Sequence, residues 1–177
     1  MKRLGELVGR ELNWVHPDWR RMEYELQDGT ECAATLRFRT TWGTLATAES
    51  GDGCWTFKRV GFLQTRATIR ACGEDRELAS FRNNAWKGGG ILELPDGRRY
   101  PANTNFWMTS FDFTTEAGEP LVTYRRIGGL LQLSSAMEIQ PAAVSVGEFP
   151  WVAMLGWYLA VQLHRDSALA GTGGGGG

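Results

Sequence analysis

The sequence predicts a mainly β protein, a closed or nearly closed antiparallel barrel of about twelve strands that encloses a hydrophobic C-terminal α-helix. Short segments of alternating polarity, separated by turn residues, fill the chain from about residue 22 to 146. Residues 149–163 (FPWVAMLGWYLAVQL) are apolar on every side of a helix, so they need an apolar environment all round. No long helical pattern lies between the strands, which disfavours a parallel βαβ sheet.

Residues 1–20 are expected to form an irregular N-terminal arm. They alternate poorly, and they contain no apolar core of signal-peptide length. A single barrel domain is expected over 21–166, because 177 residues suit one domain with a substantial core.

The strand predictions rest on turn dipeptides and alternation. Asp28-Gly29 and Asp96-Gly97 are typical of hairpin turns. Between such turns apolar and polar residues alternate, as Leu36 and Phe38 do with Arg37. The predicted strands are 22–27, 31–38, 44–49, 54–60, 67–72, 76–82, 90–94, 98–102, 106–114, 120–127, 130–139 and 142–146.

A central helix is predicted over about 149–165. Glu148 and Pro150 suit its first turn, and positive charge at Arg165 suits its last. The run 149–163 would be about 22 Å long, against about 30 Å for the apolar core of a bilayer. In a small domain of strands the sheet must therefore curl around this helix, with Gly156 allowing a close approach to the wall.

This order of elements, with the string GWYLAVQL (156–163), resembles the tubby-like C-terminal domain superfamily, which includes tubby proteins, phospholipid scramblases and LURP-one-related proteins. The resemblance covers roughly 20–165. It implies a closed barrel around the helix and a non-enzymatic module that binds phosphoinositides or associates with membranes. It maps no phosphoinositide pocket or calcium-binding segment onto particular residues here.

Other features exclude several classes of site. Three cysteines (Cys32, Cys54, Cys72) have neither metal-ligand spacing nor a close pair, so no disulfide framework is expected and a reducing compartment, the cytoplasm, is favoured. No catalytic or phosphate-loop motif occurs, so no enzyme and no cofactor are predicted. A net charge of −1 does not favour nucleic acid. The Gly-rich segment 167–177 is expected to be a flexible tail.

Arginines provide the candidate binding residues. The chain has 16 Arg against 3 Lys, and Arg suits bidentate contacts to phosphate or carboxylate. Arg37 and Arg39 share one strand face, and Arg66 and Arg70 share another. They form the hypothetical site for an anionic headgroup. The competing interpretation is a solvated outer wall in which these arginines pair with glutamates across strands.

Three functions are compatible with these patterns. The first is a barrel module that binds an anionic phospholipid headgroup or a protein partner on its outer surface, either in the cytoplasm or peripheral to a membrane. The second is a scramblase-like membrane protein with the C-terminal helix inserted in the bilayer. The third is a ligand-binding or enzymatic barrel, which needs an open lumen.

Overall fold

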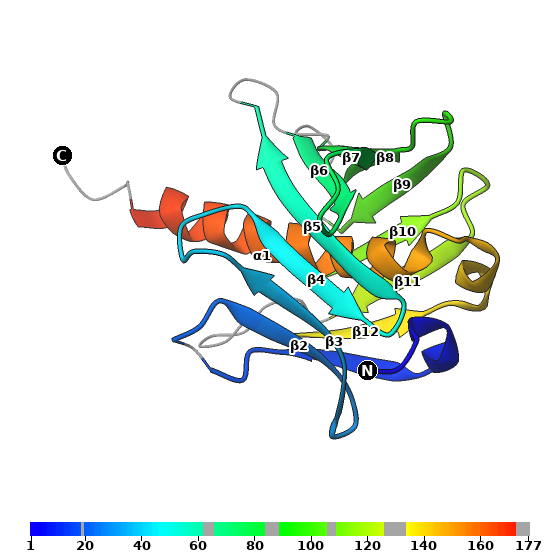
Figure 1. Cartoon of the computed structure of the whole chain (residues 1–177), viewed down its shortest axis with the longest axis horizontal. Coiled ribbons are helices and arrows are strands. Elements are labelled where there is room, and N and C mark those ends of the chain that lie inside the picture. Colours follow the sequence, from blue (N-terminus) through cyan, green and yellow to red (C-terminus); the bar gives the residue numbers. More distant parts are fainter. Residues whose placement is uncertain (19, 62–65, 84–88, 106–108, 126–133, 173–177) are drawn as a thin grey trace.

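The structure, a computed structural model, describes residues 1–18, 20–61, 66–83, 89–105, 109–125 and 134–172. Over these residues twelve antiparallel strands close into a barrel, and one α-helix, α1 (Phe149–Thr172), runs through it (Figure 1). Strands adjacent in sequence pair with each other, and β1 pairs with β12 to close the ring. The predicted fold class is confirmed.

The strands are β1 (Glu11–Val15), β2 (Glu23–Asp28), β3 (Glu31–Phe38), β4 (Ala46–Ser50), β5 (Gly53–Val60), β6 (Arg66–Ala71), β7 (Glu77–Asn83), β8 (Gly90–Glu93), β9 (Arg99–Thr104), β10 (Ser110–Thr114), β11 (Pro120–Arg125) and β12 (Ser135–Ile139). Two short 3₁₀ helices, η1 (Leu4–Leu7) and η2 (Pro141–Ser145), flank β1 and α1. Gly29 and Gly97 have φ values of 63° and 88°, so the Asp-Gly turns take the left-handed conformation that glycine tolerates.

Two predictions about elements were wrong, and they offset each other in the strand count. The expected N-terminal arm contains β1, which pairs with both β12 and β2. The alternation of apolar and polar residues in this strand is short, because only Leu12 and Trp14 are buried among its five residues. The predicted strand 142–146 is instead largely the 3₁₀ helix η2, which starts at Pro141 and buries Ala143. Parts of the strands predicted over 106–114, 120–127 and 130–139 lie outside the described residues.

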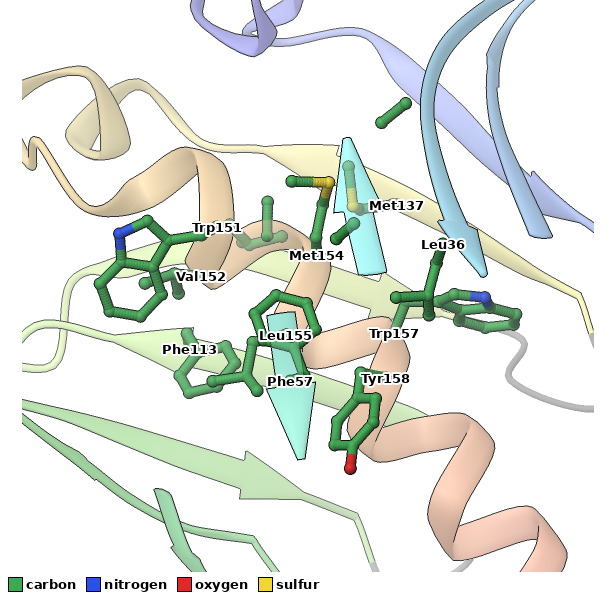
Figure 2. Packing of buried hydrophobic residues seen from close by; sticks show 14 of the residues in the cluster. Leu36, Phe57, Phe113, Met137, Trp151, Val152, Met154, Leu155, Trp157 and Tyr158 are labelled. Atoms are coloured by element: carbon green, nitrogen blue, oxygen red, sulfur yellow. The ribbon is translucent and has the colours of Figure 1, made fainter. Parts of the chain in front are cut away.

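The lumen is filled by the side chains of α1. Met154, Leu155, Trp157 and Tyr158 are fully buried, and Figure 2 shows them directed toward surrounding strands. Trp157 stacks on Trp14 of β1 with ring centroids 5.6 Å apart. The lumen that a lipocalin-like ligand site needs is therefore occupied by the protein itself.

Tyr158 links α1 to the opposite wall. Its ring lies 5.7 Å from Phe38 and 5.5 Å from Phe57, and its hydroxyl donates a 2.7 Å hydrogen bond to the Thr44 carbonyl. Burial raises the pKa of this hydroxyl above its ordinary value, so it stays protonated and remains a donor.

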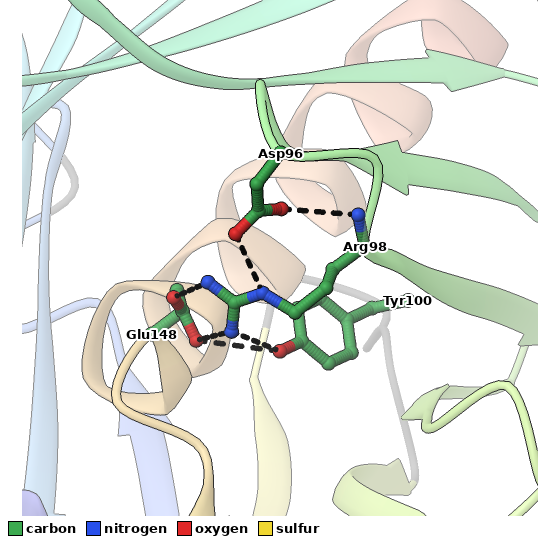
Figure 3. Close-up of polar contacts among 4 residues, drawn as sticks. All are labelled: Asp96, Arg98, Tyr100 and Glu148. Carbon is green, nitrogen blue, oxygen red and sulfur yellow. Dashed lines mark hydrogen bonds and ion pairs between the residues drawn. The ribbon is translucent and has the colours of Figure 1, made fainter.

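The N-terminal end of α1 is fastened by an ionic network (Figure 3). The Arg98 guanidinium donates to both oxygens of Glu148, at 2.7 and 3.1 Å, and to Asp96 at 2.8 Å. Tyr100 donates to Glu148 at 3.3 Å. Glu148 therefore does more than complement the helix dipole, because it ties the start of α1 to the β8–β9 turn.

The helix continues beyond the predicted end at 165 to Thr172, so the tail predicted over 167–177 is wrong for residues 167–172. Residues 173–177 lie outside the described residues.

Enclosure of α1 argues against the alternative in which this helix is inserted in a membrane. Insertion would expose the apolar side chains of the barrel wall that α1 covers. Within the described ranges, no helix has the length and apolarity that crossing a membrane requires.

The expectation about cysteines was also wrong. Cys54 of β5 and Cys72, the residue that follows β6, form a disulfide with Cα atoms 5.4 Å apart. The two are 18 residues apart in sequence, but the register that pairs Trp55 with Ala71 places them opposite each other. Disulfides persist in oxidising environments, so cysteine usage no longer favours a reducing compartment.

Removal of this disulfide is expected to destabilise the barrel by about 3 kcal/mol, the chain-entropy value for a loop of this size. Guanidinium unfolding of the oxidised protein and of a C54S/C72S variant would measure the difference. The C32S variant is the control, because Cys32 is a free thiol. Equal unfolding midpoints for the oxidised protein and C54S/C72S would contradict the expectation.

Candidate anion-binding surface

The four predicted arginines lie on different parts of the barrel wall. Arg37 is on β3 and Arg70 on β6, in one row across the sheet through Thr47 and Thr56. Three strand spacings separate these two arginines, or about 14 Å along a flat sheet. Their inward neighbours, such as Leu36 and Ile69, are buried, so the arginine side chains face outward.

Three of the four arginines are engaged by glutamates. Arg37 bonds Glu23 at 2.7 Å and lies 3.6 Å from Glu49. Arg66 and Arg70 both contact Glu77, at 3.1 and 3.4 Å. The hydrogen bond to Glu23 raises the pKa of Arg37, so its guanidinium stays charged. The structure thus brings Arg66 and Arg70 together, and leaves Arg37 in a separate ion pair.

Arg39 differs from the other three. It lies just beyond the end of β3 in the 39–45 connection and is exposed. Among the described residues, no carboxylate lies within ion-pair distance of its side chain. Arg39 therefore keeps its charge available to an external anion.

The 39–45 connection is held from inside by α1. Arg165 donates to the carbonyls of Thr41 and Gly43, and its guanidinium lies 5.3 Å from the Phe38 ring centroid. The backbone of Arg39 closes the connection with a 2.9 Å hydrogen bond to Leu45. Trp42, at its tip, is 80% exposed. The connection is anchored by the helix while it presents an indole to solvent.

The position of this connection defines two ends of the barrel. The helix-exit end comprises the described connections after odd-numbered strands, with the two strand residues on each side of every connection. It also includes residues 164–166 of α1, which leaves the barrel there (Figure 1). The helix-entry end comprises residues 1–12, the connections after even-numbered strands with the two strand residues on each side of them, and residues 140–148. In a strictly sequential barrel the strand order alone sends alternate connections to opposite ends.

Charge is strongly segregated between these ends. The helix-exit end has nine basic and three acidic side chains: Arg20, Arg21, Arg37, Arg39, Arg59, Arg66, Arg82, Arg125 and Arg165, against Asp18, Glu23 and Asp166. The helix-entry end has seven basic and fifteen acidic side chains: Lys2, Arg3, Arg10, Arg70, Arg76, Arg98 and Arg99, against Glu6, Glu11, Asp28, Glu31, Glu49, Asp52, Glu74, Asp75, Glu77, Glu93, Asp96, Glu116, Glu119, Glu138 and Glu148. A net charge of −1 for the chain therefore conceals one basic end and one acidic end.

The basic end contains a local electrostatic conflict. Arg66 of β6 lies directly opposite Arg82 of β7, and like charges in that position destabilise a sheet. Glu77 offsets the charge of Arg66, whereas Arg82 is exposed and has no ion-pair partner among the described residues. On its other side Arg82 pairs in register with Ile91, whose side chain is 46% exposed. Cationic and apolar groups thus adjoin each other on this end.

Sequence reasoning found Arg39 but missed the grouping around it. Trp42, Arg82 and Arg165 come from three distant segments, and only the barrel topology places them at one end. A signal was present: connections that follow odd-numbered strands are rich in arginine, and those that follow even-numbered strands are rich in carboxylates. Using that signal requires the strictly sequential barrel topology, which sends alternate connections to opposite ends.

The described part of the chain contains no group of three or more His, Cys, Asp or Glu side chains placed to hold a metal ion. No protein-family model, curated protein or solved structure matches this chain. The class that the fold defines is a closed twelve-stranded barrel around a hydrophobic helix. Membership of the tubby-like superfamily remains a hypothesis based on the order of these elements.

Proposed function

We propose that this protein is a non-enzymatic binding module, of the tubby-like and LURP-one-related kind, that recognises the anionic headgroups of phospholipids. The observation that carries this proposal is the helix-exit end, with nine arginines against three carboxylates and an exposed Trp42. Peripheral attachment to a membrane surface follows from the proposal, with α1 kept inside the barrel.

The chemistry of these side chains suits a lipid headgroup. A guanidinium presents several donors in a planar fork that matches phosphate oxygens. Basic residues near an anionic membrane contribute about 1 kcal/mol each to binding. Tryptophan favours the interfacial region of a bilayer, where its ring is partly buried and its N–H stays hydrated. Arg39 and Trp42 lie in the same connection, so both reach one surface.

An acidic protein partner is the second candidate. Trp and Arg are the residues most often found at the energetic centre of protein interfaces, and the helix-exit end exposes both. A charged rim of this kind would steer such a partner without fixing its identity.

Co-sedimentation with vesicles tests the lipid version. We expect the protein to pellet with vesicles of phosphatidylcholine and 30% phosphatidylserine, and to stay in the supernatant with phosphatidylcholine alone. Raising the salt concentration should release it, because attraction between exposed charges is screened. Equal and negligible pelleting with both vesicle types would remove the lipid proposal and leave the protein partner as the candidate.

A further inference from the structure

The basic side chains at the helix-exit end form a ring around the barrel axis. Arg39 follows β3, Arg82 lies near the end of β7 and Arg125 ends β11, so the cationic groups are spread around the circumference. A side-on site would instead concentrate charge on neighbouring strands. A ring at one end presents its charges toward a single plane.

Some charges of the two ends meet on the wall between them: Arg37 of the helix-exit end lies 3.6 Å from Glu49 of the helix-entry end, and Arg66 lies 3.1 Å from Glu77. Of the described charged side chains, only Glu25, Lys58 and Asp112 lie outside the two ends as defined. The helix-entry end carries a twofold excess of carboxylates and would be repelled by an anionic surface. Attraction at one end and repulsion at the other give the barrel one preferred orientation.

We propose that the barrel docks end-on, with its helix-exit end against an anionic bilayer surface and Trp42 entering the interface. This inference rests on the proposed function and adds the surface and the orientation to it. The arginines contact headgroup phosphates and carboxylates around the rim. Hydrogen bonds from Arg165 and Tyr158 to the Gly43 and Thr44 carbonyls hold the backbone of the 39–45 connection, so little backbone conformational entropy is lost when Trp42 enters the interface.

Charge reversal at either end tests the orientation. Arg39 and Arg76 are both exposed and neither has an ion-pair partner among the described residues, but Arg39 lies at the helix-exit end and Arg76 at the helix-entry end. R39E and R76E change the net charge equally. We expect R39E to weaken partitioning onto vesicles with 30% phosphatidylserine by about tenfold or more. R76E should bind within about twofold of the wild type, since a distant charge is screened.

Entry of Trp42 into the interface is tested by quenching with brominated phosphatidylcholine in the same vesicles. We expect bound wild-type protein to lose more tryptophan emission than bound W42A at equal occupancy. W42A should also bind several-fold more weakly while melting at the same temperature, because this side chain is 80% exposed in the free protein. Equal quenching of the two proteins would show that Trp42 stays outside the bilayer and would overturn this part.

The outcomes separate the inference from the function it rests on. If the wild type does not bind anionic vesicles, both lipid recognition and end-on docking are wrong. Binding to heparin under the same conditions would then indicate that the basic end binds another polyanion. Wild-type binding that R39E leaves unchanged, or that R76E weakens as much as R39E does, overturns end-on docking and leaves lipid recognition standing. Loss of vesicle binding in R39E, with binding retained in R76E, supports docking by the helix-exit end.

Discussion

Removal of residues 148–177 is expected to abolish cooperative folding. The barrel wall directs Leu36, Phe57 and Phe113 inward, and all three are fully buried in a cluster with α1. Without the helix these side chains would face water across an open lumen. Burial of each large apolar side chain is worth about 1.5–3 kcal/mol. A truncated barrel would therefore collapse or aggregate and not remain as an empty ring.

A single substitution tests the same point with less disruption. Trp157→Ala is expected to destabilise the protein by about 3–5 kcal/mol, because it removes a fully buried ring that stacks on Trp14 and contacts Tyr24. Trp42→Ala is the matched control, the same chemical change at a side chain that is 80% exposed, and should alter stability by less than about 0.5 kcal/mol. Chemical denaturation of both variants gives the comparison.

Two results would contradict this account of the core. One is a truncated protein without 148–177 that stays monomeric and melts in a single sharp transition. The other is a similar loss of stability in W157A and W42A. Either would mean that the wall closes through its own hydrogen bonds and that α1 contributes little.

Most of the barrel was predictable because a strand with one face on a core must alternate. The strand predicted at 31–38 coincides with β3, where inward Leu36 and outward Arg37 are unambiguous. The helix was equally clear, since 149–163 is apolar all round and only enclosure satisfies it. Both signals are local, so a single sequence contains them.

The errors arose where the decisive contact is distant in the chain. Strand β1 is identified by its pairing with β12, more than a hundred residues away, and not by its own five residues. The Cys54–Cys72 bond depends on the β5–β6 register. Of the four arginines predicted to bind an anion, Arg39 keeps its charge available to an external anion. Glu23, Glu49 and Glu77 form ion pairs with the other three arginines, and only the strand register determines these pairs.

Gly156→Ala is expected to destabilise the protein, although intrinsic helix propensity argues the opposite. In a helix interior alanine is favoured over glycine by about 1 kcal/mol. A Cβ at 156, however, would lie 2.4 Å from Tyr124 Cε2 and 2.5 Å from its Cζ. Tyr124 is fully buried, and its hydroxyl donates to the Ala153 carbonyl, so the ring has no direction in which to retreat. We expect a net loss of about 1–3 kcal/mol.

A double-mutant cycle with Tyr124→Leu isolates the contact. Leucine lacks the outer ring atoms, so in that background Gly156→Ala should become neutral or stabilising, and the cycle should show a coupling energy of about 1–3 kcal/mol. Gly147→Ala serves as the control, because a Cβ there would meet nothing within 4 Å. If Gly156→Ala stabilises the wild-type protein, helix propensity outweighs the contact and α1 does not approach β11 as closely as the structure places it. If it destabilises both backgrounds equally, the cost arises elsewhere than at Tyr124.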